Sequence, residues 1–533
     1  MQVKEYSRTK NSLLNMATGL FGQVTLTLLR FASRTVFIYV LGAEYLGIGG
    51  LFSNILTLLS LSELGVGSAI IFKLYKPMAL KDERRVKMLV KFFRRAYAAI
   101  GCIFLLLGIL MIPLLPVLIK NYHKLDELGI NAPLVFFLYL MQSVSTYLFS
   151  AYRTVIIKTA MKRYILNMVG FIFNVITVGT QIAILLCPLG FISSKPEKFM
   201  LYVGVVIILG IFQNWTCAII ATKMYPWAFK KEKESLPRKE QWGVVKDCAA
   251  LMVYKVNGVV LKATDNLVIS YFLGLRWVGL YSNYFLIYLT INQFVKHFHS
   301  GVKESMGNAY AKESIEKNYF IFEMMNYLTI LLKGTACVGI AICSNELIDL
   351  WVGEEYIIPQ PLPLLLGIES LFFGLKVNLG QARNISGAFR QAWYRPLMGI
   401  VINLGVSIVL CKYIGICGVI IGTITADVLT NFLIDPFIIH KYSYKGYKPA
   451  SYYYKKNLTY MLLLAVVGIA DYLLCRVMVT GLPIVDLVLH ALVCLVSVPV
   501  TFLLIYQKTD VCQYLFERAK SSKLMQRIKR TRS

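Results

Sequence analysis

The sequence predicts an all-α polytopic membrane protein of about fourteen transmembrane helices, arranged as two pseudo-symmetric six-helix lobes followed by two C-terminal helices. Apolar runs of roughly 18 residues or more recur along the whole chain. The 533 residues are 57% hydrophobic and only 16% charged, whereas a soluble domain carries about 25% charged residues. A short phrase also recurs in the two halves, which indicates an internal repeat.

Each apolar run predicts one helix. In chain order, the predicted spans are 12–41, 45–72, 92–119, 132–152, 164–188, 199–222, 245–273, 277–300, 319–343, 360–381, 396–413, 415–440, 457–478 and 482–507.

The loops between these helices divide into a basic set and a set with few bases. Most Lys and Arg residues fall in the N-terminal segment and in every second loop, whereas the loop 344–358 has none. Because cytoplasmic loops collect Lys and Arg, this asymmetry places both termini in the cytoplasm. It also accounts for most of the net charge of +28 without nucleic acid as a partner.

These helices and loops predict a division of the chain. We expect an N-terminal lobe at 1–222, a cytoplasmic linker at 223–246, a C-terminal lobe at 247–440, helices 13 and 14 at 441–507, and a basic cytoplasmic tail at 508–533. Apolar residues spaced among the bases of the tail are typical of an interfacial helix on anionic lipid, and a solvated basic tail is the alternative.

Several classes of chemistry lack their sequence signals. The eleven cysteines are scattered, mostly in apolar stretches, and no CxxC pair occurs, so neither a zinc site nor a disulfide framework is indicated. No GxxxxGK[ST] phosphate-binding motif is present, which argues against direct use of ATP. The predicted loops are too short to favour a membrane glycosyltransferase, polymerase or ligase.

The repeated phrase reads LGAEYLGIGGLFSN at 41–54 and LGLRWVGLYSN at 273–283. Each copy has Leu-Gly, four residues, Gly, and then Leu-aromatic-Ser-Asn, with three extra residues in the first copy. The copies stand at the ends of predicted helices 1 and 7, so both have the same membrane orientation. This arrangement predicts a parallel repeat whose axis runs along the membrane normal.

An offset of 232 residues superposes Gly42 on Gly274, and it then aligns polar residues within the first helix of each half. The aligned pairs are Gln23 with Lys255, Arg30 with Lys262 and Arg34 with Asn266.

Each of these helices carries its polar residues as one stripe, since spacings of three and four residues return to the same helix face. The stripes are Gln23, Thr27, Arg30 and Arg34, and Lys255, Gly258, Lys262 and Asp265.

Two interpretations of the intramembrane charges stay open. A cation at the bilayer centre costs about 2.5–3.5 kcal/mol, so it must face water or a counter-ion. In the first interpretation, buried ion pairs fix helix packing. In the second, a central cavity between the lobes carries excess positive charge and attracts an anionic substrate, for which Arg suits phosphate oxygens. The candidate counter-ions are Glu63, Asp265, Glu369 and Asp427, and Lys296 and Lys376 are further candidate cavity bases.

The stretch 39–86 resembles bacterial polysaccharide-type flippases of the multidrug/oligosaccharidyl-lipid/polysaccharide exporter superfamily. The resemblance rests on the Leu-Gly-x4-Gly phrase, LFSN, SLSELGVGSAI and LYKPMA. It is strong over 1–160, moderate over 245–310 and architectural beyond. It implies two six-helix lobes in a V, two further helices, and transport by alternating access.

The resemblance also implies a substrate, a location and an energy source. The substrate would be an undecaprenyl-pyrophosphate-linked oligosaccharide, flipped across the bacterial cytoplasmic membrane for capsule, O-antigen or exopolysaccharide assembly. Membrane lipids and polysaccharide polymerase or export proteins would be partners. An inward Na+ or H+ gradient would drive transport without a cofactor, with Glu63 and Asp427 as candidate coupling acids that could equally be counter-ions.

Basic residues of helices 1 and 7 line the cavity in such flippases, and the matches by helix are Arg30, Arg34, Lys255 and Lys262. A lipid-linked peptidoglycan precursor flippase and a multidrug cation antiporter of the same superfamily are the alternatives. The antiporter would call for an acidic cavity.

Overall fold

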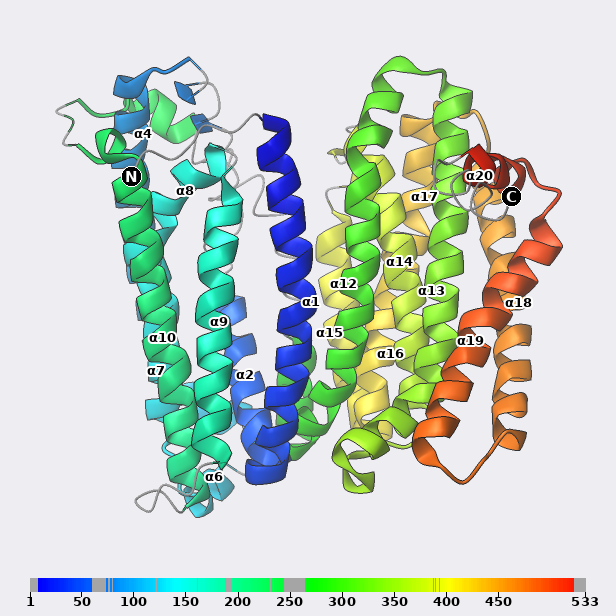
Figure 1. The fold of residues 1–533 in the computed structure, drawn as a ribbon, viewed down its shortest axis with the longest axis horizontal. Helices are drawn as coiled ribbons and strands as arrows, with labels where there is room; N and C mark the ends of the chain where they lie inside the picture. Colours follow the sequence, from blue (N-terminus) through cyan, green and yellow to red (C-terminus); the bar gives the residue numbers. More distant parts are fainter. Residues whose placement is uncertain are drawn as a thin grey trace, which may run out of the picture. The chain divides into compact units, whose positions relative to one another are not determined.

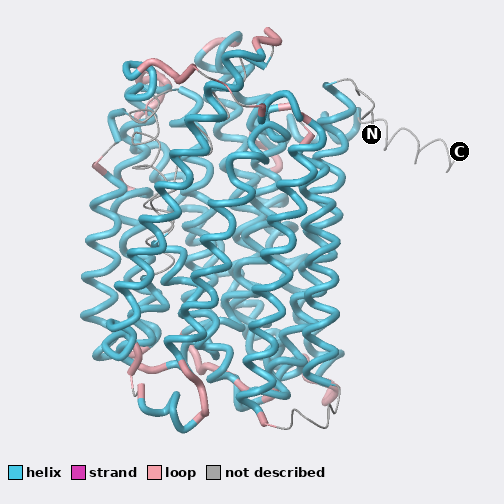
Figure 2. Tube along the Cα trace, turned by 90° about the vertical axis from the view of Figure 1, so that its left-hand side faces the viewer, coloured by secondary structure: helices cyan, strands magenta, loops and turns pink. Residues whose placement is uncertain are grey.

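The computed structural model describes residues 8–59, 73–74, 77–78, 80–120, 122–160, 162–186, 194–230, 232, 234–243, 264–386, 388, 390–392 and 394–521. These residues form helices and connecting segments, with no strand among them (Figure 2). The predicted all-α class is therefore confirmed. The chain divides into two compact units, Met1–Gly279 (unit 1) and Leu280–Ser533 (unit 2). This division follows packing rather than the repeat, so the predicted lobe and linker boundaries stay a prediction.

Unit 1 is built from long helices joined by short segments (Figure 1). The π-helical turn η3 (Thr146–Ala151) joins α7 to α8, the 3-10 turns are η2 (Ile112–Leu114) and η4 (Pro226–Phe229), and 264–272 is also helical. The α-helices are α1 (Arg8–Leu41), α2 (Ala43–Leu59), α4 (Glu83–Met111), α5 (Leu115–Leu118), α6 (His123–Glu127), α7 (Ala132–Ser145), α8 (Tyr152–Thr159), α9 (Arg163–Leu186) and α10 (Lys195–Met224).

Unit 2 begins within α12 (Leu275–Lys312) and contains the other long helices. α16 is continued by the π-helical segment η7 (Val428–Phe432), the short α-helix α17 (Ile434–Ile438) and the π-helical segment η8 (Ile439–Ser443). Two short 3-10 helices are η5 (Glu354–Tyr356) and η6 (Arg390–Ala392). The remaining helices are α13 (Ile315–Val352), α14 (Leu362–Ser386), α15 (Arg395–Ile414), α16 (Ile416–Asp427), α18 (Ala450–Val477), α19 (Pro483–Tyr506) and α20 (Asp510–Ser521).

Ten described helical spans are long and apolar enough to cross a membrane, and each corresponds to one predicted span. The chain is thus a multi-pass membrane protein. The four other predicted spans are helices 1 and 2 and their repeat counterparts 7 and 8. They correspond to α1, to the 17-residue α2, to the partly described segment 245–273 and to α12.

The 232-residue offset recurs at helix starts. Asp82 caps α4 by accepting a hydrogen bond from the Arg85 amide at 3.0 Å. Ser314 caps α13 by accepting one from the Lys317 amide at 3.3 Å. Such caps satisfy amide groups that have no partner within the helix. Because Asp82 and Ser314 are 232 residues apart, the repeat extends to the start of the third helix of each half.

The repeated phrase also has the same backbone conformation in both copies. Gly42 has φ +94° and Gly274 has φ +98°, in the left-handed region that favours glycine. Each glycine ends one helix, and the next helix starts at the following residue, Ala43 or Leu275. The sequence phrase therefore encodes one sharp helix-to-helix junction, used twice.

The two halves share a pattern of neighbouring helices. In unit 1, α4 packs on α7, α7 on α10, and α9 on α10. In unit 2, α13 packs on α14, α14 on α16, and α15 on α16. These pairs correspond one to one under the repeat. This agreement supports the predicted parallel duplication.

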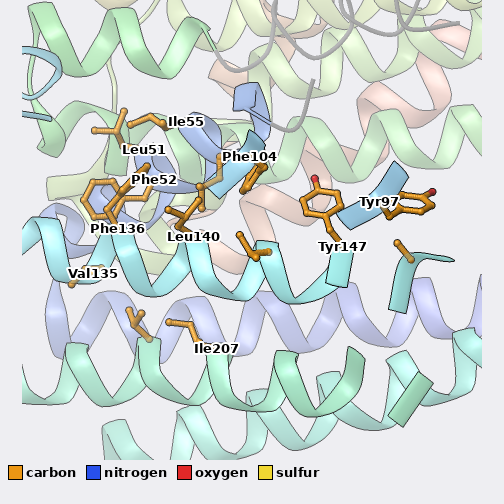
Figure 3. Packing of buried hydrophobic residues seen from close by; sticks show 14 of the residues in the cluster. Leu51, Phe52, Ile55, Tyr97, Phe104, Val135, Phe136, Leu140, Tyr147 and Ile207 are labelled. Atoms are coloured by element: carbon orange, nitrogen blue, oxygen red, sulfur yellow. The ribbon is translucent and has the colours of Figure 1, made fainter. Parts of the chain in front are cut away.

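A hydrophobic core holds the helices of unit 1 together (Figure 3). Phe52 of α2 meets Phe136 of α7 edge to face, with ring centroids 5.4 Å apart. Phe104 of α4 packs on Tyr147 of η3 at 5.3 Å. Such aromatic pairs add about 0.5–1.5 kcal/mol beyond the area they bury, so α2 and α4 are fixed against the α7–η3 segment.

The start of the C-terminal tail is helical and packs on unit 2, while both alternatives for the tail as a whole stay predictions. Residues 510–521 form α20, and its Val511 and Cys512 side chains are buried in the unit 2 core. Tyr514 contacts Phe320 of α13, with ring centroids 5.4 Å apart. This part of the tail packs on its own protein because its apolar residues find a partner there. The predicted basic end at 522–533 lies outside the described residues.

Candidate functional site in the membrane helices

The two predicted arginines of helix 1 lie one turn apart on α1. Arg30 is exposed, whereas Arg34 is half-buried beside Tyr202 of α10. Tyr202 also lies next to Ser33 and to Gln181 of α9. Arg34 therefore borders a polar cluster contributed by three helices of unit 1, and Arg30 is the more accessible of the two bases.

The other predicted site residues of helices 1, 2 and 7 are described only in part. Asp265 and Asn266 are buried in the described helical stretch 264–272, and Asn266 Oδ1 has no hydrogen-bond partner within the described residues. Gln23 lies on α1, and its side chain is outside the described residues, as are Glu63, Lys255 and Lys262. The roles predicted for all of these residues stay predictions.

Glycines of the repeated phrase make a close backbone contact within unit 1. A Cβ atom added to Gly47 would lie 2.2 Å from the Leu275 carbonyl oxygen. One added to Gly279 would lie 2.1 Å from the Ala43 carbonyl oxygen. Leu275 and Ala43 are equivalent under the 232-residue offset, so the contact is reciprocal. This reciprocity is the relation expected between two copies related by a twofold axis.

Unit 2 contains a buried ionic cluster around Asp435 of α17. Arg383 of α14 donates from Nη1 to both carboxylate oxygens, at 2.6 and 2.7 Å. Arg395 of α15 donates to Asp435 Oδ2 at 2.7 Å and also to the Asn431 side-chain oxygen. The Asp435 side chain is 0% exposed. Three helical segments are therefore joined by charge-assisted hydrogen bonds in a region without solvent.

A second ion pair extends this cluster along α14. Lys376 Nζ lies 2.8 Å from Asp427 Oδ1, and the Asn431 amide donates to the same oxygen at 2.8 Å. The Asp427 side chain is 3% exposed and that of Lys376 is 26% exposed. Asp427 thus has Lys376 as a counter-ion. A paired Asp427 is the arrangement expected under the ion-pair interpretation.

A buried lysine on α13 forms the other end of the polar network. Lys333 is fully buried and donates to Ser370 Oγ at 3.1 Å and to the Asn292 side-chain oxygen. Glu369, next to Ser370 on α14, is hydrogen-bonded by the hydroxyl of Tyr288 on α12. Polar side chains of α12, α13 and α14 therefore meet inside unit 2.

These residues of unit 2 are called the polar network below, and the network contains more basic than acidic side chains. Its described members include four cations and three carboxylates. Lys296 adds a further, exposed cation, with its Nζ 5.3 Å from the Phe373 ring centroid. The cations are Lys333, Lys376, Arg383 and Arg395, and the carboxylates are Glu369, Asp427 and Asp435.

No family model matches this sequence, and no curated protein matches it. Solved structures do. An inward-facing multidrug resistance MATE family transporter of the MOP superfamily covers 80% of this chain and 96% of its own, with TM-score 0.55 and 14% identity. The lipid II flippase MurJ, inward closed, covers 93% and 99%, with TM-score 0.59 and 12% identity. A mutant of the Vibrio cholerae MATE transporter VcmN covers 81% and 98%, with TM-score 0.55 and 12% identity.

The chain has the MATE/MurJ fold. At 12–14% sequence identity, the similarity to these structures establishes the fold but not the function, because one fold hosts several functions. Within the MATE/MurJ fold of this chain, the predicted arginines lie on α1, and the polar network lies on α12 to α17.

Sequence reasoning missed part of the polar network, although spacing gives a signal. Residues seven apart return to one helix face, and α14 carries charges at that spacing. Arg383 and Arg395 escaped notice because 383–395 reads as a cytoplasmic loop, whereas α14 continues to Ser386 and α15 starts at Arg395. Glu369, Lys376 and Arg383 are seven residues apart on α14. Asp427, Asn431 and Asp435 are four residues apart on the span that begins with α16.

Proposed function

We propose that this chain is a flippase for a phosphate-bearing, lipid-linked oligosaccharide. The substrate is an undecaprenyl-pyrophosphate-linked repeat unit, moved by alternating access from the inner to the outer leaflet of a bacterial cytoplasmic membrane. The product serves capsule, O-antigen or exopolysaccharide assembly. The observation that carries the proposal is a fold shared with a lipid II flippase over 93% of this chain, on helices that hold bases within the membrane.

The charge of these helices supports an anionic substrate. Arg30 is accessible and Arg34 lies one turn away on the same helix. A guanidinium group offers a planar set of donors that matches phosphate oxygens. In this proposal the pyrophosphate binds Arg30, Arg34, Lys255 and Lys262, and the prenyl tail stays in lipid.

A peptidoglycan precursor flippase is the second candidate, because the matched flippase is described as acting on lipid II. Its substrate carries the same kind of phosphate group, so only the sugar separates the two candidates. A multidrug antiporter is less favoured, because cationic drugs call for acidic partners and the MATE structures match a smaller share of this chain.

Deletion of the gene, followed by mass spectrometry of prenyl-linked glycans, tests the proposal. We expect one lipid-linked oligosaccharide to accumulate, and its sugars identify the pathway. Re-expression of the wild-type protein should clear it, whereas an Arg30→Ala/Arg34→Ala variant present at the same level should not. The proposal fails if no prenyl-linked glycan accumulates.

A further inference from the structure

A basic pocket of about 800 Å³ lies in unit 1, and none of its lining residues belongs to the polar network of unit 2. Its lining residues come from α4, α8, the end of α10 and the segment that follows α10. Six lining side chains are cationic and one is acidic. The cations are Lys87, Lys91, Arg94, Arg95, Arg153 and Lys230, and the acid is Glu232.

The positive charge of this pocket is only partly neutralised. Lys87 pairs with Glu83 at 3.5 Å. Lys91 donates to the main-chain oxygens of Glu232 at 2.8 Å and Glu234 at 3.2 Å, and these neutral acceptors cancel no charge. Within the described parts of the chain, no carboxylate forms an ion pair with Arg94, Arg95, Arg153 or Lys230.

One guanidinium group is held in place by an aromatic neighbour. Arg153 Nε donates to the Tyr152 hydroxyl at 2.8 Å, and the guanidinium carbon lies 5.3 Å from the Tyr152 ring centroid. This contact uses one of the five N–H donors of the side chain. The remaining donors are on the two terminal nitrogens, which form the planar fork that binds phosphate oxygens.

The sequence places this pocket at the membrane surface. Arg94 and Arg95 are exposed, and they immediately precede the apolar run of α4 at 96–111. α8 ends six residues after Arg153, at Thr159, and α10 ends at Met224. Basic residues at this depth meet the phosphates of anionic lipids.

We propose that this pocket binds a phosphate group at the membrane surface, supplied by the headgroup of an anionic phospholipid. Among the described residues, four cations of the pocket have no ion-pair partner, and the single lining acid is outnumbered. The same chemistry would accept a soluble phosphate compound, so the test separates the two sources. This proposal does not require the transported substrate to be the one proposed above.

The test uses the full-length protein in nanodiscs. One set contains phosphatidylcholine alone, a second adds phosphatidylglycerol, and a third is phosphatidylcholine with inorganic phosphate in the buffer. Native mass spectrometry counts retained lipids, and melting temperature reports binding. The pocket variant is Arg94→Gln/Arg95→Gln/Arg153→Gln. The matched control, Lys441→Gln/Lys455→Gln/Lys508→Gln, removes three exposed bases of unit 2.

We expect wild type and control to retain phosphatidylglycerol and to melt at a higher temperature in its presence. The pocket variant should retain at least about tenfold less, since each base near a headgroup contributes about 1 kcal/mol. The double variant Arg94→Gln/Arg95→Gln changes only exposed side chains. It should show an intermediate loss of retained phosphatidylglycerol, and it replaces the triple variant in the test if that variant misfolds. Stabilisation by inorganic phosphate but not by phosphatidylglycerol would support the phosphate site and overturn its lipid source. Equal retention by pocket and control variants, with no effect of phosphate, overturns the proposal.

Discussion

At the scale of single residues, Asp435 is the carboxylate on which two buried arginines depend. Its side chain has no exposed surface and lies between Arg383 and Arg395. Removing one member of a buried ion pair leaves an uncompensated charge, which costs about 3–5 kcal/mol. Asp435 is thus a stability determinant of unit 2 whatever the substrate is.

We predict that Asp435→Asn lowers the free energy of unfolding by about 3–5 kcal/mol. Denaturation of the purified protein in detergent measures the change. Asp349→Asn is the matched control, because Asp349 is exposed at the end of α13, and it should change stability little. Equal stability of the two variants would contradict a structural role for the cluster.

The reciprocal glycine contact gives a second prediction at this scale. Gly47→Ala and Gly279→Ala should each destabilise the protein, because the added methyl group would lie within about 2.2 Å of a carbonyl oxygen. Gly204→Ala in α10 meets no atom within 4 Å, so it should be neutral or slightly stabilising. Melting temperatures of the three variants provide the comparison. Similar melting temperatures would argue against close packing of the repeated phrases.

At the scale of helices, α14 supplies one member to the Lys376–Asp427 and Arg383–Asp435 ion pairs of the polar network and to its Tyr288–Glu369 hydrogen bond. Glu369, Lys376 and Arg383 recur every seven residues. Glu369 accepts a hydrogen bond from Tyr288, and the two bases face counter-ions on neighbouring helices. Periodicity predicts such a stripe on one face. The partners on α15 and on the span that starts with α16 could not be predicted, because which helices lie adjacent is a tertiary property.

Variants of the Lys376–Asp427 pair distinguish two roles for Asp427, a structural counter-ion and a coupling acid. If Asp427 is a counter-ion, Asp427→Asn and Lys376→Gln should each reduce stability, and the double variant should lose less than their sum, by about 1 kcal/mol. Transport should then partly recover in the double variant. If transport stays abolished while stability recovers, Asp427 acts instead as a coupling acid. A double-mutant cycle with both readouts measures this.

The C-terminal helix α20 provides an element-scale prediction. A chain ending at Thr509 loses the buried Val511 and Cys512 side chains, which should lower stability by about 2 kcal/mol. A chain ending at Ser521 keeps α20 and should match the full-length protein. Thermal unfolding of the two truncated proteins checks this. Equal melting temperatures would show that α20 adds no stability.

At the scale of the whole molecule, hydropathy and the repeated phrase predicted most of the fold. Ten spans appear as described helices near their expected bounds, because burial in lipid requires long apolar runs. The 232-residue offset predicted equivalent glycines, and these share their backbone conformation. Lys333 was missed, because a single lysine within an apolar run carries no partner in the sequence. Its partners Asn292 and Ser370 come from two other helices.

We propose that bases on α1 allow a lipid phosphate to cross the bilayer. Translocation of a purified prenyl-pyrophosphate-linked oligosaccharide by proteoliposomes containing this protein tests it most directly. We predict that the wild-type protein translocates this lipid and that the Arg30→Ala/Arg34→Ala variant does so at least about tenfold more slowly. A Leu28→Ala control should translocate it at the wild-type rate. Equal rates for wild type and the arginine variant, or transport of cationic drugs in place of the lipid, would contradict the account.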